Sequence, residues 1–215
     1  MKKTFLYMAS VAVVASLLSS CGNDNRLAKD IEGTWQANPA AVATSSPGIM
    51  TMTDTWTFTG EDSNATGGTL LIASLASVEW PLAEGSDTIA PQANAYAVSV
   101  SASVNINATW NLDPKDPDDE ILVSIDPKSI VVNIDPAGVA MSTSGSPAPL
   151  DSIPPYIYGT VKAELTKAVQ ARFFPVNKLE DVEINGNKLK FEVPSGKEKA
   201  DDVKVYLTRQ TGSAE

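Results

Sequence analysis

The chain has 215 residues, of which 16 are basic and 26 acidic, and its formal net charge is −10 at pH 7. A surface this acidic disfavours nucleic acids and anionic lipid head groups as partners. The sequence has no histidine and one cysteine, which excludes imidazole catalysis, histidine metal sites and intrachain disulfides.

The first twenty residues have the pattern of an export signal. Lys2 and Lys3 precede an apolar run from Phe5 to Leu18, and small residues follow before Cys21. A charged start, an apolar core and small residues in this order indicate a secretory signal peptide. The apolar core of about 14 residues is shorter than the roughly 20 that a membrane-spanning helix requires. A transmembrane segment is therefore not expected.

The segment Leu18-Ser19-Ser20-Cys21 resembles the bacterial lipobox. The resemblance implies that residues 1–20 are removed and that the Cys21 thiol carries a diacylglyceryl group. Several acyl chains, palmitate among them, give stable membrane attachment, which a single chain does not. The alternative is an ordinary signal peptide with an incidental cysteine. The lipobox reading places the protein on the outer membrane of a Gram-negative cell envelope, facing the periplasm or the cell exterior.

The mature chain is expected to consist of a short tether and one folded domain. Cleavage before Cys21 would leave 14 basic against 26 acidic residues, a net charge of −12. Residues 21–30 are small and polar, as in a flexible linker. Ordered structure is expected from Ile31, and residues 31–210 are long enough for a single domain. We expect a monomer.

Strict alternation predicts a strand over residues 50–59. Threonine occupies the odd positions from Thr51 to Thr59, whereas Met50, Met52, Trp56 and Phe58 share the other face. This is the period of a half-buried strand. Asp54 is the exception on the apolar face. A catalytic acid, a buried carboxylate bonded to neighbouring threonines and a misjudged register all remain open for it.

Residues 96–112 form a second alternating run of about 17 residues, longer than the usual strand of 3–10. They are expected to form one long, bent strand or two strands that share a kink. Further strands are predicted at 69–79, 120–125 and 129–134, with a turn at 126–129.

One helix is predicted at about 155–173. Ile157, Val161, Leu165 and Val169 recur at four-residue spacing, and Pro175 limits the end of the helix. Such an apolar stripe needs a surface to cover, so the helix is expected to close one mouth or flank of the sheet.

The C-terminal part of the chain returns to strands. Residues 182–193 are predicted to form a hairpin that turns at Asn185-Gly186. Residues 203–208 supply a closing strand.

Gly33-Thr34-Trp35 resembles the Gly-x-Trp signature in the first strand of lipocalin-like barrels, and Arg209 matches the arginine that packs across the tryptophan. The resemblance implies that Gly33, Trp35 and Arg209 close the barrel through a cation–π contact, which needs no ligand. It departs from that family because the helix precedes the last three strands. The fold class predicted is mainly β: an antiparallel up-and-down barrel of about 8–9 strands with one helix. The alternative is an open β-sandwich.

Aromatic residues are the candidates for a ligand site. Ligand sites are largely apolar and aromatic, with a few polar anchors. Small barrels can equally be filled by their own side chains. The candidates, which would otherwise be core residues, are Trp56, Phe58, Trp80, Tyr96 and Trp110.

Carboxylates gather between two strands at residues 113–120. Asp113, Asp116 and Asp118 are weak candidates for Ca²⁺, because that ion prefers oxygen ligands. The spacing does not match an EF-hand, and a solvated hairpin loop is the alternative. No other metal site is expected.

These observations predict a lipid-anchored, non-enzymatic protein that needs no cofactor and holds a small apolar or amphipathic ligand in its barrel. The alternative is a structural or adhesive surface module with a filled core, whose loops, including 143–155, contact macromolecules. An empty interior cavity would favour the first, and a filled core the second.

Overall fold

The computed structural model describes residues 26–42, 49–62, 64–82, 96–143, 146–148, 155–195 and 202–210. The expected signal peptide, Cys21 and most of the loop at 143–155 lie outside these ranges. Signal cleavage, lipid attachment and the role of that loop therefore stay predictions. No helix among the described residues is long and apolar enough to cross a membrane.

The ordered elements are mostly strands, which belong to one continuous sheet. In chain order they are α2 (Arg26–Ile31), β1 (Gly33–Ala37), β2 (Ala40–Val42), β3 (Ile49–Gly60), β4 (Gly67–Leu82), β5 (Tyr96–Leu112), β6 (Ile121–Ile125), the 3-10 turn η1 (Pro127–Ser129), β7 (Val131–Thr143), β8 (Ser146–Ala148), α3 (Pro155–Phe173), β9 (Lys178–Asn185), β10 (Lys188–Val193) and β11 (Val203–Arg209).

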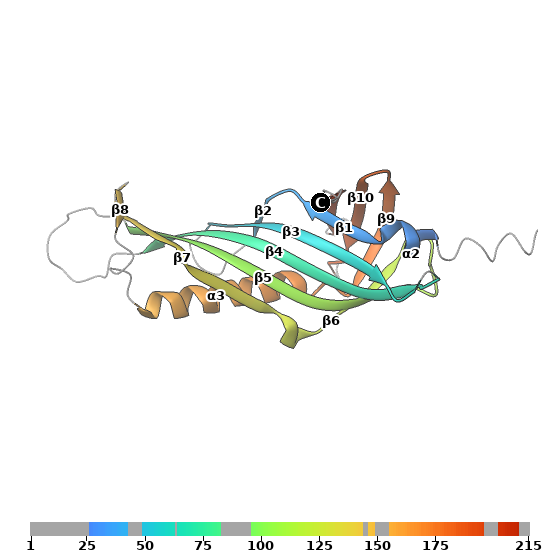
Figure 1. The fold of residues 1–215 in the computed structure, drawn as a ribbon, viewed down its shortest axis with the longest axis horizontal. Coiled ribbons are helices and arrows are strands. Elements are labelled where there is room, and N and C mark those ends of the chain that lie inside the picture. The colour runs from blue at the N-terminus through green and yellow to red at the C-terminus, as the bar shows by residue number, and fades with distance from the viewer. Residues whose placement is uncertain are drawn as a thin grey trace, which may run out of the picture.

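Eight of the described strands close into an antiparallel barrel, at the end of the molecule that carries β1, β9 and β10 (Figure 1). The order around the barrel is β1–β3–β4–β5–β6–β9–β10–β11, and β11 pairs with β1 again. Each strand neighbours the next barrel strand in the chain. The predicted up-and-down barrel is confirmed, and it replaces the alternative of an open sandwich.

The longest barrel strands continue far beyond the barrel. Residues 108–112 of β5 pair with β6, whereas residues 96–105 pair with β7. Outside the barrel, β3, β4, β5 and β7 therefore run on as an extended sheet (Figure 1), which β2 and β8 border. The alternating run at 96–112 is one strand of 17 residues. The strand predicted at 129–134 begins at Val131 and extends to Thr143.

Alternation along β3 places one set of side chains inside the protein. Met50, Met52, Trp56 and Phe58 are each no more than 3% exposed. The threonines between them lie on the solvent side, half-buried or exposed. The inner face of β3 therefore contributes to both the barrel interior and the covered side of the extended sheet.

Helix α3 covers the inner face of the extended sheet and runs along it toward the barrel (Figure 1). Val161, Leu165 and Val169 are buried, as the four-residue spacing predicted. The side chain of Ile157 lies outside the described part of the chain. The predicted helix is confirmed at both ends: it begins at Pro155, and Pro175 follows its last residue by two positions.

Ordered structure begins earlier than the composition of residues 21–30 indicated. Residues Arg26–Ile31 form helix α2, in which Leu27, Ala28 and Ile31 are buried. The prediction of a flexible linker is therefore wrong for residues 26–30. Three buried side chains in six residues explain why this short helix is ordered, because isolated helices of this length are marginal in water.

The hairpin of β9 and β10 is confirmed, but its turn is displaced by one residue. Asn185 pairs with Lys188, so Gly186 and Asn187 form the two-residue loop. Gly186 has φ of 61°, whereas Asn187 does not have a positive φ. A positive φ at the first loop position alone fits a type II′ turn, in which glycine is favoured at that position.

Candidate functional site

The lipocalin-like signature is built as predicted. Trp35 on β1 pairs with Arg209 on β11, and the guanidinium carbon lies 4.1 Å from the centre of the indole ring. This distance is that of a cation–π contact. Trp35 is fully buried, and its Nε1 donates a hydrogen bond to the Ile31 carbonyl at 2.7 Å. The contact joins the first strand of the barrel to the last.

Arg209 also satisfies the end of helix α2. Its Nη1 donates to the Glu32 carbonyl at 2.7 Å, and its Nη2 donates to the Asp30 carbonyl. Carbonyls at a helix C-terminus lack partners within the helix. Gly33 leaves space for the guanidinium, because a Cβ there would lie 2.9 Å from Nη1 of Arg209, and its φ is +120°. Gly33, Trp35 and Arg209 therefore act as one structural unit.

Aromatic side chains fill the centre of the barrel. Ring centroids are 6.3 Å apart for Trp56 and Phe58, 5.9 Å for Phe58 and Trp110, and 5.3 Å for Trp56 and Phe191. Phe173 from α3 also reaches the Trp56 ring, at 6.4 Å. All five side chains are buried. These contacts place Phe58 and Trp110 in the packed core, which was the alternative to a ligand-binding role.

The structure does not bring all five candidate aromatic residues together. Trp80 pairs with Val98 and Tyr96 pairs with Leu82, at the far end of the extended sheet. Trp80 is eight residues from Ile72, the strand partner of Trp56, which corresponds to about 26 Å along β4. The side chains of Trp80 and Tyr96 lie outside the described part of the chain. The backbone thus separates Trp80 and Tyr96 from Trp56, and a ligand-binding role for those two residues stays a prediction.

A pocket of about 630 Å³ lies at the mouth of the barrel, where α3 ends. We call it the mouth pocket. Its wall comes from residues 37–41, from Asp54 and Trp56, from the C-terminal turn of α3, and from the facing ends of β10 and β11. This volume falls in the range of small-molecule sites, about 300–1,000 Å³. Of the three predicted ligand-binding residues whose side chains are described, Trp56, Phe58 and Trp110, it is Trp56 that lines the pocket.

The mouth pocket opens where the barrel wall lacks strand pairing. β11 pairs with β1 through residues 207–209, and within the described chain residues 203–206 have no strand partner on that side. β2 pairs with β3 on one edge, and no described strand pairs with its other edge. Val203 and Tyr206 are 59% and 61% exposed. Two unpaired strand edges therefore flank the pocket.

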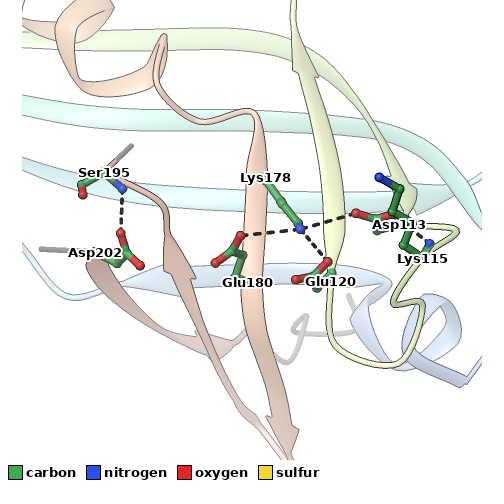
Figure 2. A network of polar contacts seen from close by, with 7 residues as sticks. All are labelled: Asp113, Lys115, Glu120, Lys178, Glu180, Ser195 and Asp202. Carbon is green, nitrogen blue, oxygen red and sulfur yellow. Dashed lines mark hydrogen bonds and ion pairs between the residues drawn. The ribbon is translucent and has the colours of Figure 1, made fainter. Parts of the chain in front are cut away.

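The start of β11 is held beside the end of β10. The backbone N–H of Ser195 donates to the Asp202 carboxylate at 2.8 Å (Figure 2). Lys204 and Glu192 form an ion pair at 3.1 Å, in which the Glu192 side chain is 7% exposed. These contacts fix β11 to β10 at the side of the pocket where β1 is absent.

A buried ion pair forms part of the pocket wall. Asp54 is 3% exposed, accepts a hydrogen bond from Ser74 Oγ at 2.7 Å, and pairs with Arg172 Nη2 of α3. The partners of Asp54 are thus a serine on β4 and an arginine, and the predicted bonds to neighbouring threonines are wrong. A carboxylate engaged in this way explains how an acid is tolerated on the apolar face of β3.

Trp56, which lines the same pocket, also has a buried hydrogen-bond donor without a partner in the described part of the chain. Its Nε1 is buried, and no acceptor for it is found among the described residues. Buried indole N–H groups usually have a partner, because leaving one unpaired costs about 1–3 kcal/mol. The wall itself combines apolar surface with one ion pair, and the unsatisfied Trp56 donor is buried within the protein.

Comparisons with known protein families, with curated proteins and with solved structures found no match to this chain. The likeness to lipocalins is therefore one of barrel architecture and of the residues at its closure. The predicted departure is confirmed, because α3 precedes the last three strands, β9, β10 and β11. The function of the protein has to be inferred from its own residues.

A second polar cluster holds β6 against β9. These strands share two paired positions, Ile121–Leu179 and Leu122–Lys178. The Lys178 Nζ lies 3.4 Å from the Asp113 carboxylate and 3.5 Å from that of Glu180, and also pairs with Glu120 (Figure 2). Its hydrogen bond to Glu120 raises the pKa of Lys178 above its usual range. We call this group the lysine clasp.

The clasp uses an acid that was a weak candidate for Ca²⁺. The Asp113 carboxylate accepts a hydrogen bond from the Lys115 backbone N–H at 2.9 Å, which lowers the pKa of Asp113. Within the described residues, no group of three acidic side chains is arranged to hold a metal ion. Asp116 and Asp118 are exposed in the loop. The alternative of a hairpin loop therefore describes residues 113–120 better than a calcium site.

The environment of Asp119 in this loop disfavours the ionised form of its carboxyl group. Burial raises the pKa of its carboxyl, and the charge of Asp116 adds to the effect. Its Oδ1 is buried and has no hydrogen-bond partner among the described residues. Its backbone carbonyl accepts from the Val182 N–H at 2.9 Å, so Asp119 connects the loop to β9.

Sequence reasoning missed most of the mouth pocket. Arg172 is 118 positions from Asp54 in the chain, and no local pattern connects the two residues. The one usable signal was the position of Asp54 among apolar neighbours, which requires a polar or cationic partner. No sequence pattern predicts which residues of β11 lack a strand partner, because this depends on the residue at which β1 ends.

Proposed function

We propose that this protein is a lipid-anchored binding protein of a Gram-negative cell envelope. It holds a small amphipathic ligand in the mouth pocket, and it is not an enzyme. The observation that carries the proposal is the pocket of about 630 Å³ whose wall combines apolar side chains with the Asp54–Arg172 pair. The polar part of a bound molecule would lie against the partly exposed Arg172 guanidinium, while its apolar part would cover the rest of the wall.

The position of the pocket favours an elongated ligand. The unpaired edges of β2 and β11 leave the wall open sideways, and Val203 and Tyr206 present apolar surface there. A molecule that enters between these edges reaches Trp56 and the Asp54–Arg172 pair at the inner end. Apolar surface at the entrance and polar groups inside match an amphipathic molecule better than a purely apolar one.

The charges at the pocket support binding without catalysis. Asp54 is the only carboxylate among the lining residues of the described chain, and it is engaged by Arg172 and Ser74. Hydrolysis by paired carboxylates needs two of them across a cleft. The absence of histidine from the sequence removes the usual general base.

Membrane attachment is supported by the sequence. The charged start, the apolar run and Leu18-Ser19-Ser20-Cys21 occur in the order of a lipoprotein signal. Helix α2 starts at Arg26, so a mature chain starting at Cys21 would have few residues between the lipid and this helix. The α2 end of the barrel would then lie close to the membrane surface, and the mouth pocket, at the opposite end of β1, would face away from it.

The ligand is tested by native mass spectrometry of the protein purified from the bacterium that makes it. We expect a bound small molecule that is lost in Val203→Trp, because the larger side chain would occupy the entrance of the pocket. Leu122→Trp is the matched control, since Leu122 is 38% exposed on β6 and does not line the pocket. Empty wild-type protein, or equal retention by both variants, would rule out the mouth pocket as the site.

The anchor is tested separately by Cys21→Ser in the full chain. We expect the wild type in the membrane fraction, with the added mass of acyl groups at Cys21. The variant should lack this mass and should not be processed at the same position. A membrane-bound and unmodified wild type would contradict lipid attachment at Cys21 without affecting the ligand proposal.

A second function is favoured by the packed centre of the barrel. Contacts of Trp56 with Phe58 and Phe191 leave the middle of the barrel to side chains, as expected for a structural or adhesive surface module. Such a module would act through its outer surface and need no small ligand. Recovery of ligand-free protein that still binds a macromolecule of the envelope would support this function over the first.

A further inference from the structure

The outer face of the extended sheet carries no charge over four neighbouring strands. The outward positions are the odd-numbered residues of 51–57 on β3, 71–77 on β4, 101–107 on β5 and 131–133 on β7. Their register places them side by side in rows, such as Thr53, Leu75, Ser103 and Asn133. We call this surface the uncharged face. The face ends before Glu79 on β4, one row beyond Ser77, and before Asp135 on β7, two residues beyond Asn133.

This composition is unusual for an exposed surface of an acidic protein. Surfaces of small soluble domains are about 25–35% charged, so fourteen outward positions would carry about four charged side chains. Here they carry threonine, serine, asparagine, alanine, leucine and valine. The chain as a whole has a net charge of −10. The charges are therefore excluded from this face and concentrated elsewhere.

Apolar side chains form a strip along the middle of the face. Leu75 is 70% exposed, Leu71 is 41% exposed, and both lie on β4. Val131 on β7 is 46% exposed. A hollow of about 580 Å³ lies around Leu75, between Thr53 and Ser103. The face thus has an apolar centre, a hydroxyl and amide rim, and a depression that can receive a side chain.

We propose that the uncharged face binds a second copy of this chain. Two copies with the same net charge repel each other wherever acidic surfaces meet. The uncharged face is a surface through which they can approach without bringing like charges together. This inference goes beyond the proposed ligand-binding function and replaces the expectation of a monomer.

The size of the face fits a weak dimer. With strands about 4.8 Å apart and a rise of about 3.3 Å per residue, fourteen outward positions that each represent two residues cover roughly 440 Å². Two such faces bury about 900 Å² in total, which is in the range of weak, transient interfaces. The dimer is therefore expected to depend on concentration.

A twofold axis would bring the apolar strip of one copy against the same strip of the other. In such an interface the same patch meets itself, so contacts occur in symmetric pairs. The Leu71–Leu75 strip of one copy would lie against that of the other, with Leu75 of each copy near the hollow of its partner. The surrounding threonine, serine and asparagine side chains can donate and accept hydrogen bonds with their symmetry mates.

The test uses a photo-crosslinking amino acid placed in the full chain in cells. Position 75 is the probe site, and position 122, which is exposed on β6 outside the face, is the matched control. We expect illumination to give a product of about twice the chain mass of 22.7 kDa from position 75 and not from position 122. Adding Thr53→Asp or Asn107→Asp to the position 75 probe should reduce the product at least fivefold, and adding Leu122→Asp should not.

The outcomes separate the possible occupants of the face. Absence of a dimer product from position 75, or a product equally strong from position 122, would overturn the proposal. Capture of a different protein or of a glycan at position 75 would overturn it as well. Because Thr53 and Asn107 are at the surface, comparable amounts of uncrosslinked variant and wild type would show that the charge acts on the interface and not on folding. A fall in the amount of uncrosslinked variant that matches the fall in product would overturn that part of the argument.

Discussion

Breaking the Asp54–Arg172 pair is expected to have unequal effects depending on which partner is removed. The Asp54 side chain is 4% exposed and that of Arg172 is 28% exposed. Arg172→Met leaves a buried carboxylate with Ser74 as its remaining hydrogen-bond donor, and should lower the free energy of unfolding by about 3–5 kcal/mol. Asp54→Leu leaves a guanidinium that can reach water, and should cost about 1–3 kcal/mol.

The double variant tests whether the two residues act as a pair. Replacing both charges by apolar groups removes the burial of an unpaired charge, so Asp54→Leu with Arg172→Met should be more stable than Arg172→Met alone. The coupling energy from this double-mutant cycle should be about 2–3 kcal/mol. As a control, Lys167→Met removes a surface ion pair of α3, in which Lys167 is 67% exposed, and should change stability by about 0.5 kcal/mol or less.

The measurement is urea denaturation followed by far-ultraviolet circular dichroism, with the dependence on urea compared among variants. Equal losses for the two single variants would refute the reasoning, because burial would then not decide the penalty. A coupling energy near zero would refute it as well, because α3 would not be held to the barrel through this pair.

Three further predictions concern the closure of the barrel and the loop beside it. Arg209→Lys keeps the charge but loses the fork that reaches two carbonyls and stacks on Trp35, and it should cost about 1–3 kcal/mol in urea denaturation. The pKa of Asp113 is lowered and that of Lys178 is raised in the folded state. The lysine clasp should therefore stabilise the protein at pH values that lie between these two pKa values. This stability should fall as the pH drops below the ordinary Asp value of 3.8 and as it rises above the ordinary Lys value of 10.5. Lys178→Met, followed by thermal melting, should remove the alkaline limb and flatten the acid limb only in part, because the Lys115 backbone N–H still lowers the pKa of Asp113. Asp119→Asn should raise the melting temperature at pH 7, since the raised pKa of Asp119 means that its ionised form is disfavoured on folding; an unchanged or lower melting temperature would contradict this.

Alternation in the sequence was sufficient to predict β3 and β5, whereas most of β7 was missed. The threonines of β3 and the serines and asparagines of β5 mark the solvent side, and the apolar residues between them are buried. A two-residue period depends only on local backbone geometry, which is why it can be recognised in sequence. Helix α3 was predicted for the same reason, from the spacing of Val161, Leu165 and Val169.

The site was less predictable, because it depends on lengths and on distant contacts. Alternation and aromatic character made both Trp56 and Trp80 candidates for a ligand site. Only the structure shows that β4, which carries Trp80, extends far beyond the barrel that holds Trp56. Arg172 meets Asp54 only after the sheet and helix have assembled. Composition also misjudged residues 26–30, because burial of Leu27 and Ala28 depends on the barrel that follows.

The mouth pocket follows from a mismatch of strand lengths. β5 has 17 residues and β4 has 16, whereas β1 and β6 have five each. A barrel can be only as tall as its short strands, so ten residues of β5 extend about 33 Å beyond it with an apolar inner face. The 19 residues of α3 span about 28 Å and cover this face. The helix ends at the barrel mouth with Phe173 against Trp56, and β1 ends before it can pair with the start of β11. The pocket is the space that neither the helix nor the short strand fills, so lengthening β1 across residues 38–41 would close it, whereas changes in the packed centre of the barrel would not.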